Sequence, residues 1–181
     1  MKNIIAIAGS NSSKSINKQF VKFIASQYPD INYLNLENFE PPMYSSDLEN
    51  DYGTHQKIKD LVAKFQAADA VIVSTPEHNS MPPAFFKNIL DWLSRTGATY
   101  LEGAKYLQDK PVLLASVSPG KGGAASSQAL VGKMLGYGGA KIVSNLTVGG
   151  FYDSFENDKV VNEALIQEIE NAISDLKAAI D

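Results

Sequence analysis

The chain has 181 residues, 44% of them hydrophobic, and carries a formal net charge of −4. This length suits a single domain, residues 1–181, with an ordinary hydrophobic core, and the absence of cysteine excludes disulfides, thiolate metal sites and thiol nucleophiles. Scattered lysines and a weakly acidic balance argue against a nucleic-acid partner, and no apolar run approaches the roughly 18 residues of a membrane-spanning helix. We therefore expect a soluble, cytoplasmic protein with no membrane partner.

Short apolar runs alternate along the chain with helical patterns. Strands are predicted at 4–8, 31–36, 70–74, 111–117 and 141–148, and helices around 16–24, 58–65, 85–93, 130–135 and 161–176. Thr54 is expected to cap the second helix, and Pro82 and Pro83 to stand near the start of the third. Residues 37–53 form the longest stretch predicted to be irregular. The alternation predicts an α/β fold with a five-stranded parallel sheet and helices on both of its faces.

Three polar loops follow the first, third and fourth predicted strands. Their sequences are GSNSSKSIN (9–17), TPEHNSMPP (75–83) and SPGKGGAASSQ (118–128). In open α/β sheets, ligands bind outside the carboxyl ends of the strands, at the point where the strand order reverses. If the strand order is 2-1-3-4-5, the three loops meet there and form one pocket.

The first of these loops is rich in serine and runs into a helix. Hydroxyl groups and the free N–H groups of a helix N-terminus suit a bound phosphate, and Lys14 adds positive charge. The spacing matches neither the dinucleotide fingerprint nor the P-loop, so a terminal monophosphate is the favoured ligand. The alternative is that Ser15 only caps the helix.

The second loop carries polar groups suited to the edge of a flat heterocycle. Backbone groups of Glu77, His78 and Asn79 can supply donors and acceptors if the neighbouring prolines hold the loop still. Glu77 is open to three interpretations: a general base, a contact to the ring edge, or a solvated side chain. His78 is either catalytic or simply packs against a ring or faces solvent. His78 and His55 lack a carboxylate cluster, so no metal site is predicted.

The third loop contains Gly120, Gly122 and Gly123, which allow a ligand to approach the backbone closely or simply form a flexible turn. Lys121 contacts either an anion or water.

Several motifs together resemble the NAD(P)H-dependent FMN reductase family, a flavodoxin-like group that includes quinone, chromate and azo-dye reductases. The motifs are Gly9-Ser10-x-x-x-x-Ser15-x-Asn17, Pro76-Glu77-x-Asn79-x-x-x-Pro83, Pro41-Pro42-Met43-Tyr44 through Asp47, and Lys87-Asn88-Ile89-Leu90-Asp91-Trp92-Leu93-Ser94-Arg95. The resemblance covers most of the chain and implies a flavodoxin-like fold with sheet order 2-1-3-4-5.

The resemblance also implies a cofactor-binding set. The FMN phosphate would be held by Ser10, Ser12, Ser15 and Asn17, the isoalloxazine lined by Glu77, His78, Asn79 and Ser80, and its other side approached by Ser118, Gly120 and Gly122; Ile16 and Pro76 complete the set. Tyr44, Trp92, Phe151 and Tyr152 either wall the site or belong to core or interface packing. The chain departs from the family at Ser12 and after Gly123, where arginine is frequent, and at His78, where tyrosine is usual.

The activity implied by the resemblance is a ping-pong reaction. NADPH or NADH would pass a hydride to FMN and leave, and a small-molecule acceptor such as a quinone, free flavin or azo compound would then take its place. The flavin carries this chemistry, so no catalytic side chain is expected. A homodimer or homotetramer is implied as well. Two alternatives remain: a flavodoxin-type electron carrier, and a regulatory protein of the same fold without flavin.

Overall fold

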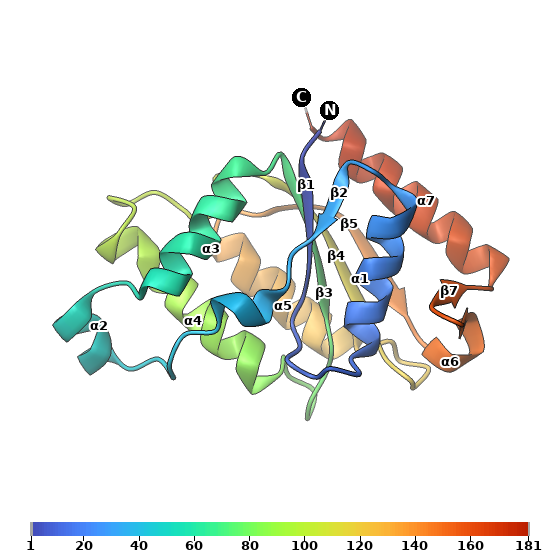
Figure 1. Ribbon diagram of the computed structural model, residues 1–181, viewed down its shortest axis with the longest axis horizontal. Coiled ribbons are helices and arrows are strands. Elements are labelled where there is room, and N and C mark those ends of the chain that lie inside the picture. The colour runs from blue at the N-terminus through green and yellow to red at the C-terminus, as the bar shows by residue number, and fades with distance from the viewer. Residues whose placement is uncertain (1, 181) are drawn as a thin grey trace.

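The computed structural model describes residues 2–180 as a sheet between two layers of helices (Figure 1). The strands are β1 (Ile4–Ala8), β2 (Ile31–Tyr33), β3 (Ala70–Thr75), β4 (Pro111–Val117), β5 (Lys141–Val148), β6 (Phe155–Glu156) and β7 (Lys159–Val160). The α-helices are α1 (Ile16–Gln27), α2 (Ser46–Tyr52), α3 (Gln56–Ala67), α4 (Ala84–Thr99), α5 (Ala125–Tyr137), α6 (Phe151–Ser154) and α7 (Glu163–Ala178), with one 3-10 helix, η1 (Leu36–Phe39).

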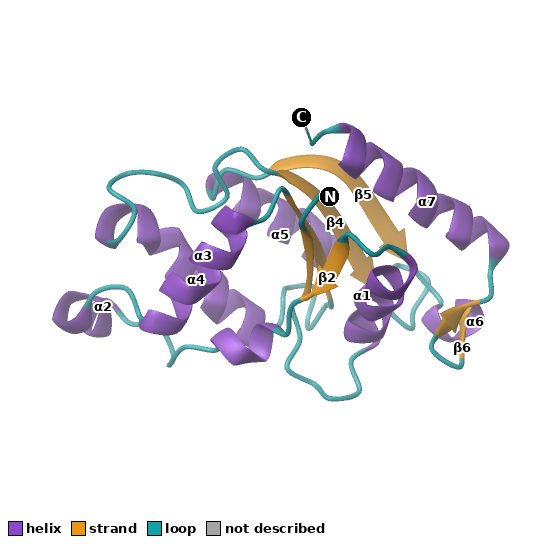
Figure 2. Ribbon diagram, turned by 45° about the horizontal axis from the view of Figure 1, so that its top comes forward, coloured by secondary structure: helices purple, strands orange, loops and turns teal. Residues whose placement is uncertain are grey.

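The main sheet has five strands in the order β2-β1-β3-β4-β5, and all four strand pairs are parallel. The predicted fold class and strand order are therefore confirmed. Helices α1 and α7 cover one face, and α3, α4 and α5 cover the other (Figures 1 and 2). Since every strand runs in the same direction, all the carboxyl ends meet at one edge of the sheet.

The central strands are buried because helices cover both of their faces. In β1, Ile5 and Ile7 pack into the core beside α3 and α4, whereas Ile4, Ala6 and Ala8 pack into the core beside α1 and α7. Every residue of β1 and β3 is buried, as the continuous apolar runs predicted. The edge strand β5 is more polar and partly exposed, and a register shift interrupts its pairing with β4.

The structure corrects several boundaries. The second strand ends at Tyr33, because the Asn35 side chain caps the 3-10 helix that follows. Thr54 does not cap α3; His55 does, through an Nδ1 that accepts the N–H of Lys57 at 3.2 Å, while the Thr54 hydroxyl pairs with Thr99.

The stretch 37–53 is not irregular, because it contains most of η1 and all of α2. The last helix begins at Glu163, so Val161 lies outside it.

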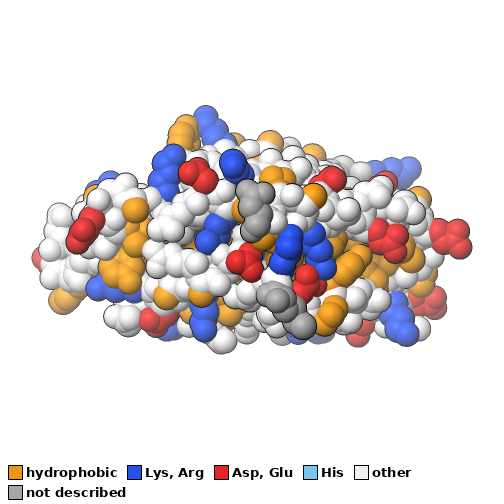
Figure 3. All heavy atoms as spheres, turned by 90° about the horizontal axis from the view of Figure 1, so that it is seen from above, with side chains coloured by type: hydrophobic (Ala, Val, Ile, Leu, Met, Phe, Trp, Pro, Cys, Tyr) orange, Lys and Arg blue, Asp and Glu red, His pale blue; other side chains and the backbone are white. Residues whose placement is uncertain are grey.

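The amino edge of the sheet carries mixed charge. Seen from above, this face shows Lys and Arg interspersed with Asp and Glu and with hydrophobic side chains (Figure 3). Neither positive nor negative charge dominates this face, as the scattered lysines in the sequence indicate. Across residues 2–180, no helix has the length and apolar character needed to cross a membrane.

Candidate functional site

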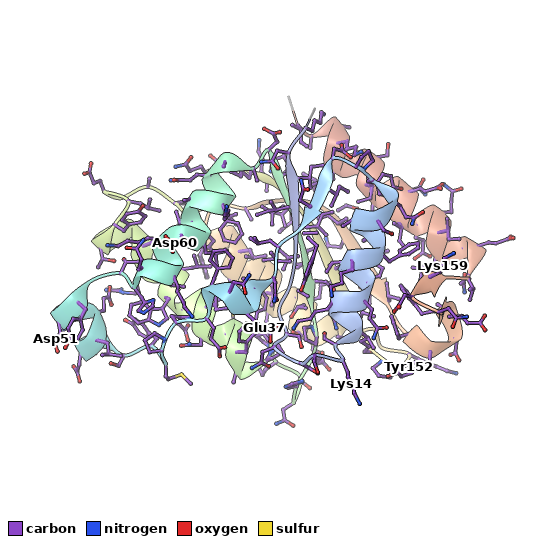
Figure 4. The ribbon with its side chains drawn as sticks, viewed as in Figure 1. Lys14, Glu37, Asp51, Asp60, Tyr152 and Lys159 are labelled. Carbon is purple, nitrogen blue, oxygen red and sulfur yellow. The ribbon has the colours of Figure 1, made fainter. Side chains whose placement is uncertain are left out.

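The three polar loops converge at the carboxyl edge of the sheet and enclose an open pocket of about 270 Å³. Its lining residues are Ser10, Ser12, Lys14, Ser15, Ile16, Asn17, Pro76, Glu77, His78, Val117, Ser118, Pro119 and Tyr152. They come from the ends of β1, β3 and β4 and from α6. In Figure 4, Lys14 and Tyr152 lie near each other at the lower end of the molecule, where these strands end.

The serine loop forms a cradle of hydroxyl and N–H groups at the start of α1. The hydroxyl of Ser15 accepts the N–H of Lys18 at 3.3 Å and caps the helix. The hydroxyl of Ser10 accepts the N–H of Ser12 at 3.2 Å, which tightens the loop. The first N–H groups of a helix have no partner inside it, so those of Ile16 and Asn17 are available to an anion.

Lys14 supplies the positive charge of the cradle. It is exposed and is the only Lys or Arg that lines the pocket. The neighbouring Lys18 is buried, and its ammonium pairs with Glu37 of η1 at 2.6 Å. This contact lowers the pKa of the Glu37 carboxyl, chiefly through the hydrogen bond that Lys18 donates. Lys18 is therefore engaged in an ion pair, whereas Lys14 is available to a ligand.

Asn17 has a structural role that its place in the serine loop does not reveal. Its side chain is buried, its Nδ2 donates to the Val117 carbonyl at 3.0 Å, and its Oδ1 accepts the Ser74 hydroxyl at 2.7 Å. The amide thus ties the start of α1 to the ends of β3 and β4. The backbone N–H of Asn17 remains available to an anion, while the side chain uses one of its two amide N–H groups and its oxygen to hold the strand ends.

The loop after β3 forms a tight two-residue turn. The N–H of His78 donates to the Met81 carbonyl at 2.9 Å, and the N–H of Met81 donates back to the His78 carbonyl at 3.1 Å. The central residues, Asn79 and Ser80, both have positive φ, as a type I′ turn requires. Prolines at 82 and 83 lead directly into α4, so the turn projects as a fixed, exposed unit.

Glu77 anchors the base of this turn. Its Oε2 accepts the backbone N–H of Ser127, in the first turn of α5, at 3.0 Å. The Ser127 hydroxyl in turn donates to the Pro76 carbonyl at 2.8 Å. Glu77 is therefore neither a freely solvated side chain nor placed by the structure as a general base; it links two loops of the site.

Glycines in the third loop divide into two kinds. A Cβ on Gly123, whose φ is +61°, would lie 2.4 Å from a Thr147 methyl carbon, so the packing itself requires glycine there. A Cβ on Gly122 would meet nothing within 4 Å, and one on Gly120 would meet only the Ser118 hydroxyl at 3.9 Å. The surface beside these two residues is open, which leaves room for a ligand.

Most of the predicted cofactor-binding residues come together in the pocket, but four do not line it: Asn79, Ser80, Gly120 and Gly122. Asn79 and Ser80 lie at the tip of the exposed turn. Val117 and Pro119 line the pocket without having been predicted, and their only sequence signal is that they flank Ser118 at the end of a strand. The binding roles of the whole set stay predictions.

Of the four aromatic residues predicted as walls of the site, only Tyr152 lines the pocket. Tyr152 is 70% exposed and lines the pocket. Phe151 is buried in the core and stacks on Phe155. Trp92 donates its Nε1–H to the Pro42 carbonyl at 2.9 Å and packs edge-to-face on Tyr44. The KNILDWLSR motif thus clasps the segment that precedes α2 and does not line this pocket.

The residues present fit a flat ligand with an anionic tail. The cradle offers hydroxyls, helix N–H groups and one lysine to the tail, and the open surface at Gly120 and Gly122 leaves space for a ring beside the 78–81 turn. Within residues 2–180, no group of three or more His, Asp or Glu side chains could hold a metal ion. The donors of the cradle are of the kind that can hold an anionic group.

Comparison with known proteins finds a matching family and several relatives. Residues 2–153 match the family described as NADPH-dependent FMN reductase. The NADH:(hydroxy)cinnamate reductase subunit CrdA of Vibrio ruber is 33% identical over 135 residues, 74% of this chain and 62% of that one. The Escherichia coli K12 quinone reductase is 36% identical over 87 residues, 48% of this chain and 43% of that one.

A solved structure shows the same fold. The flavoenzyme NAD(P)H:(acceptor) oxidoreductase FerB from Paracoccus denitrificans superposes with a TM-score of 0.78 at 22% identity, covering 99% of each chain.

Proposed function

Because the chain belongs to the NADPH-dependent FMN reductase family, we propose that it binds FMN and transfers reducing equivalents from NADPH or NADH to a small acceptor such as a quinone, a free flavin or an azo compound. The enzyme class, an NAD(P)H-dependent reductase, follows from the family; the acceptor and the ping-pong order are the proposal. It rests above all on one pocket that the serine cradle, residues 76–78 and residues 118–119 line together.

Each loop has a defined task in this proposal. The N–H groups at the start of α1, the serine hydroxyls and Lys14 hold the phosphate. The 78–81 turn presents its backbone N–H and carbonyl groups to one edge of the ring, and the loop from Ser118 to Gly122 lies against the other side. When bound, the flavin supplies the redox chemistry, accepting two electrons from the nicotinamide and giving them to the acceptor.

The chain itself orients the reactants and limits the access of water. Tyr152 stands at the mouth of the pocket, where its ring can cover the phosphate end. His78 is exposed, and its backbone N–H and carbonyl close the turn through hydrogen bonds to Met81. The reaction as proposed needs no side-chain nucleophile, which agrees with a site that brings no Ser/His/Asp set together.

Reconstitution tests the proposal directly. The purified protein, incubated with FMN and freed of excess by gel filtration, should retain a flavin absorbance, and NADPH or NADH should bleach it under anaerobic conditions. Adding a quinone should restore the absorbance with no further protein present. A protein that neither retains nor responds to FMN would contradict the proposal.

A second candidate function is electron delivery to a partner protein. The name of the Vibrio ruber relative describes a subunit of a larger reductase, and that relative is 33% identical to this chain. In this case the reduced protein would be oxidised slowly by free quinones and rapidly only by a partner. Steady turnover of NAD(P)H with a small acceptor alone separates the two functions.

We also propose that the chain assembles as a homodimer or homotetramer. Met43 and Tyr52, both on the segment clasped by α4, expose 71% and 79% of their surface, and exposed large apolar side chains are a feature of association surfaces. Sedimentation of the purified protein gives its mass, and a monomer at micromolar concentration would rule the assembly out.

A further inference from the structure

Glu77 lies where two loops of the site meet. Its side chain connects them through one hydrogen bond, in which the carboxylate accepts a backbone N–H. It belongs to the loop after β3, yet it accepts the N–H of Ser127 at the start of α5, 50 residues away. The residue at the N-cap position of α5, Ala124, has no side chain that can cap, and its φ of 63° is left-handed. A carboxylate from another element takes the place of the missing cap.

A second contact makes this junction rigid. The Ser127 hydroxyl donates to the Pro76 carbonyl at 2.8 Å and lies 3.1 Å from the Thr75 hydroxyl. Ser127 and Thr75 are both completely buried. Residues 76 and 77 are thus held to α5 by two hydrogen bonds. The Pro76 carbonyl accepts one of them, and the Glu77 carboxylate accepts the other.

The junction controls the position of the 78–81 turn. The turn has only local hydrogen bonds, between His78 and Met81, and its residues are exposed. Its place relative to the glycine loop therefore depends on its base, where Glu77 is bound, and on the prolines that lead into α4. Since the glycine loop runs directly into α5, the Glu77 contact sets the separation of the two loops.

We propose that Glu77 is a positioning residue, whose bond to the N–H of Ser127 fixes the gap between the 78–81 turn and the 118–124 loop at the width of a flavin ring. This inference rests on the proposed FMN site. Because the gap is already set in the flavin-free protein, FMN binding does not have to order the two loops. Loss of the Glu77 bond should therefore lower the FMN affinity and change the environment of the ring.

Two substitutions separate position from charge. Glu77→Ala removes the acceptor, and we expect the FMN dissociation constant to rise about tenfold, because FMN binding must then order the two loops. The visible absorption bands and the midpoint potential of the bound flavin should shift as well. Glu77→Gln keeps the acceptor oxygen and the shape, and should restore the bands and an affinity within about threefold of wild type.

The first readout needs no flavin. In the flavin-free protein, Glu77→Ala should accelerate hydrogen exchange at the Ser127 amide and in the 78–81 turn, and Glu77→Gln should not. Unchanged exchange at Ser127 in the alanine variant would overturn the inference whatever the cofactor proves to be.

A remote variant controls for lost stability. Asp30→Ala breaks the 2.7 Å pair with Lys177 outside the pocket and should lower stability without changing FMN affinity or spectrum. If Glu77→Ala behaves like Asp30→Ala, with lower stability but wild-type affinity and bands, Glu77 is only structural and the inference fails. If wild type itself binds no FMN, the proposed function fails first, and the exchange data show separately whether Glu77 sets the loops.

Discussion

Asn17 holds the start of α1 against the sheet through two buried hydrogen bonds. Its partners, the Val117 carbonyl and the Ser74 hydroxyl, belong to neighbouring strands and have no access to solvent. A polar group left unpaired in such a place costs about 1–3 kcal/mol. The residue therefore determines whether the serine cradle and the two strand ends stay in register.

Replacing Asn17 by alanine should lower the free energy of unfolding of the flavin-free protein by about 2–4 kcal/mol, because both partners are left unpaired. Urea unfolding followed by circular dichroism measures this. Asn17→Asp keeps an acceptor for Ser74 but sets a carboxylate against the Val117 carbonyl, so it should be at least as destabilising.

Asn3 provides the matched control for this change. Its exposed side chain donates to the Ala67 carbonyl at 2.9 Å, and Asn3→Ala should stay within about 0.5 kcal/mol of wild type. If Asn17→Ala were equally mild, water would have to replace the amide, and the structural role given to Asn17 would be wrong.

Helix α4 joins the site to the segment that precedes α2. Asn88, which is buried, accepts the N–H of Tyr44 at 2.8 Å and donates to the Pro42 carbonyl at 3.2 Å. Arg95 adds a contact to the buried Glu49 at 3.0 Å, and Glu49 also accepts the Tyr44 hydroxyl, which raises the pKa of that tyrosine. The clasp thus fixes a segment that has few other contacts to the sheet.

Asn88→Ala should release residues 43–52 without unfolding the protein. The loss of these bonds should accelerate hydrogen exchange in the segment about tenfold, a change of about 1.4 kcal/mol in local opening, as measured by mass spectrometry of peptic fragments. Lys87→Ala is the control, because Lys87 pairs only with the partly exposed Asp91 of its own helix. Equal exchange in both variants would show that Asn88 does not hold the segment.

The pair formed by Lys18 of α1 and Glu37 of η1 links these two elements in a pH-dependent way. Lys18 lowers the pKa of Glu37 below its ordinary 4.5, so the folded state binds this proton less readily than the unfolded state. The pair therefore stabilises the fold above the unfolded pKa, and this contribution disappears as the pH falls through the lowered pKa.

Glu37→Gln should accordingly reduce stability at pH 7 and converge with wild type as the pH falls well below 4.5. Urea unfolding at a series of pH values measures the difference. Lys18→Met keeps the aliphatic stem and should flatten the same part of the pH profile, and the double variant should add little to either change. A difference that stays constant from pH 7 to pH 3 would contradict the assigned role of the pair.

For the molecule as a whole, the strand order and the meeting of the three loops could be predicted because both depend on signals local in sequence. Buried parallel strands are continuous apolar runs, and polar loops mark their carboxyl ends. The long-range side-chain contacts could not be predicted in this way. Glu77 reaches Ser127, Asn17 reaches Val117 and Trp92 reaches Pro42 only after the chain has folded, since each pair is at least 50 residues apart.

Contacts between elements far apart in the sequence explain the remaining differences between prediction and structure. His55 takes the capping position expected for Thr54, whose hydroxyl bonds to Thr99 of another helix. Residues 37–53 were predicted to be irregular, yet they contain α2, and Arg95 of α4 holds this helix through Glu49. Tertiary contacts decided both outcomes.

Ligand-linked stability tests the whole pocket at once. A ligand that binds only the folded state stabilises it by about 2.7 kcal/mol at a concentration of 100 times its dissociation constant. For a chain of this size, that corresponds to a rise of about 5–10 °C in the melting temperature. FMN should produce such a rise, and riboflavin, which lacks the phosphate, a smaller one at the same concentration. The difference between the melting-temperature rises with FMN and with riboflavin should decrease with added salt, because the exposed charge of Lys14 is screened.

Lys14→Ala should weaken FMN about fivefold, the loss of roughly 1 kcal/mol from one partly screened charge, and leave riboflavin unchanged. Lys121→Ala is the matched control, since Lys121 is a lysine of the neighbouring loop that does not line the pocket. Equal stabilisation by FMN and riboflavin in wild type would mean that the serine cradle binds no phosphate. Equal losses for both ligands in Lys14→Ala would place the lysine against the ring instead, and the orientation of the flavin in the pocket would have to be reversed.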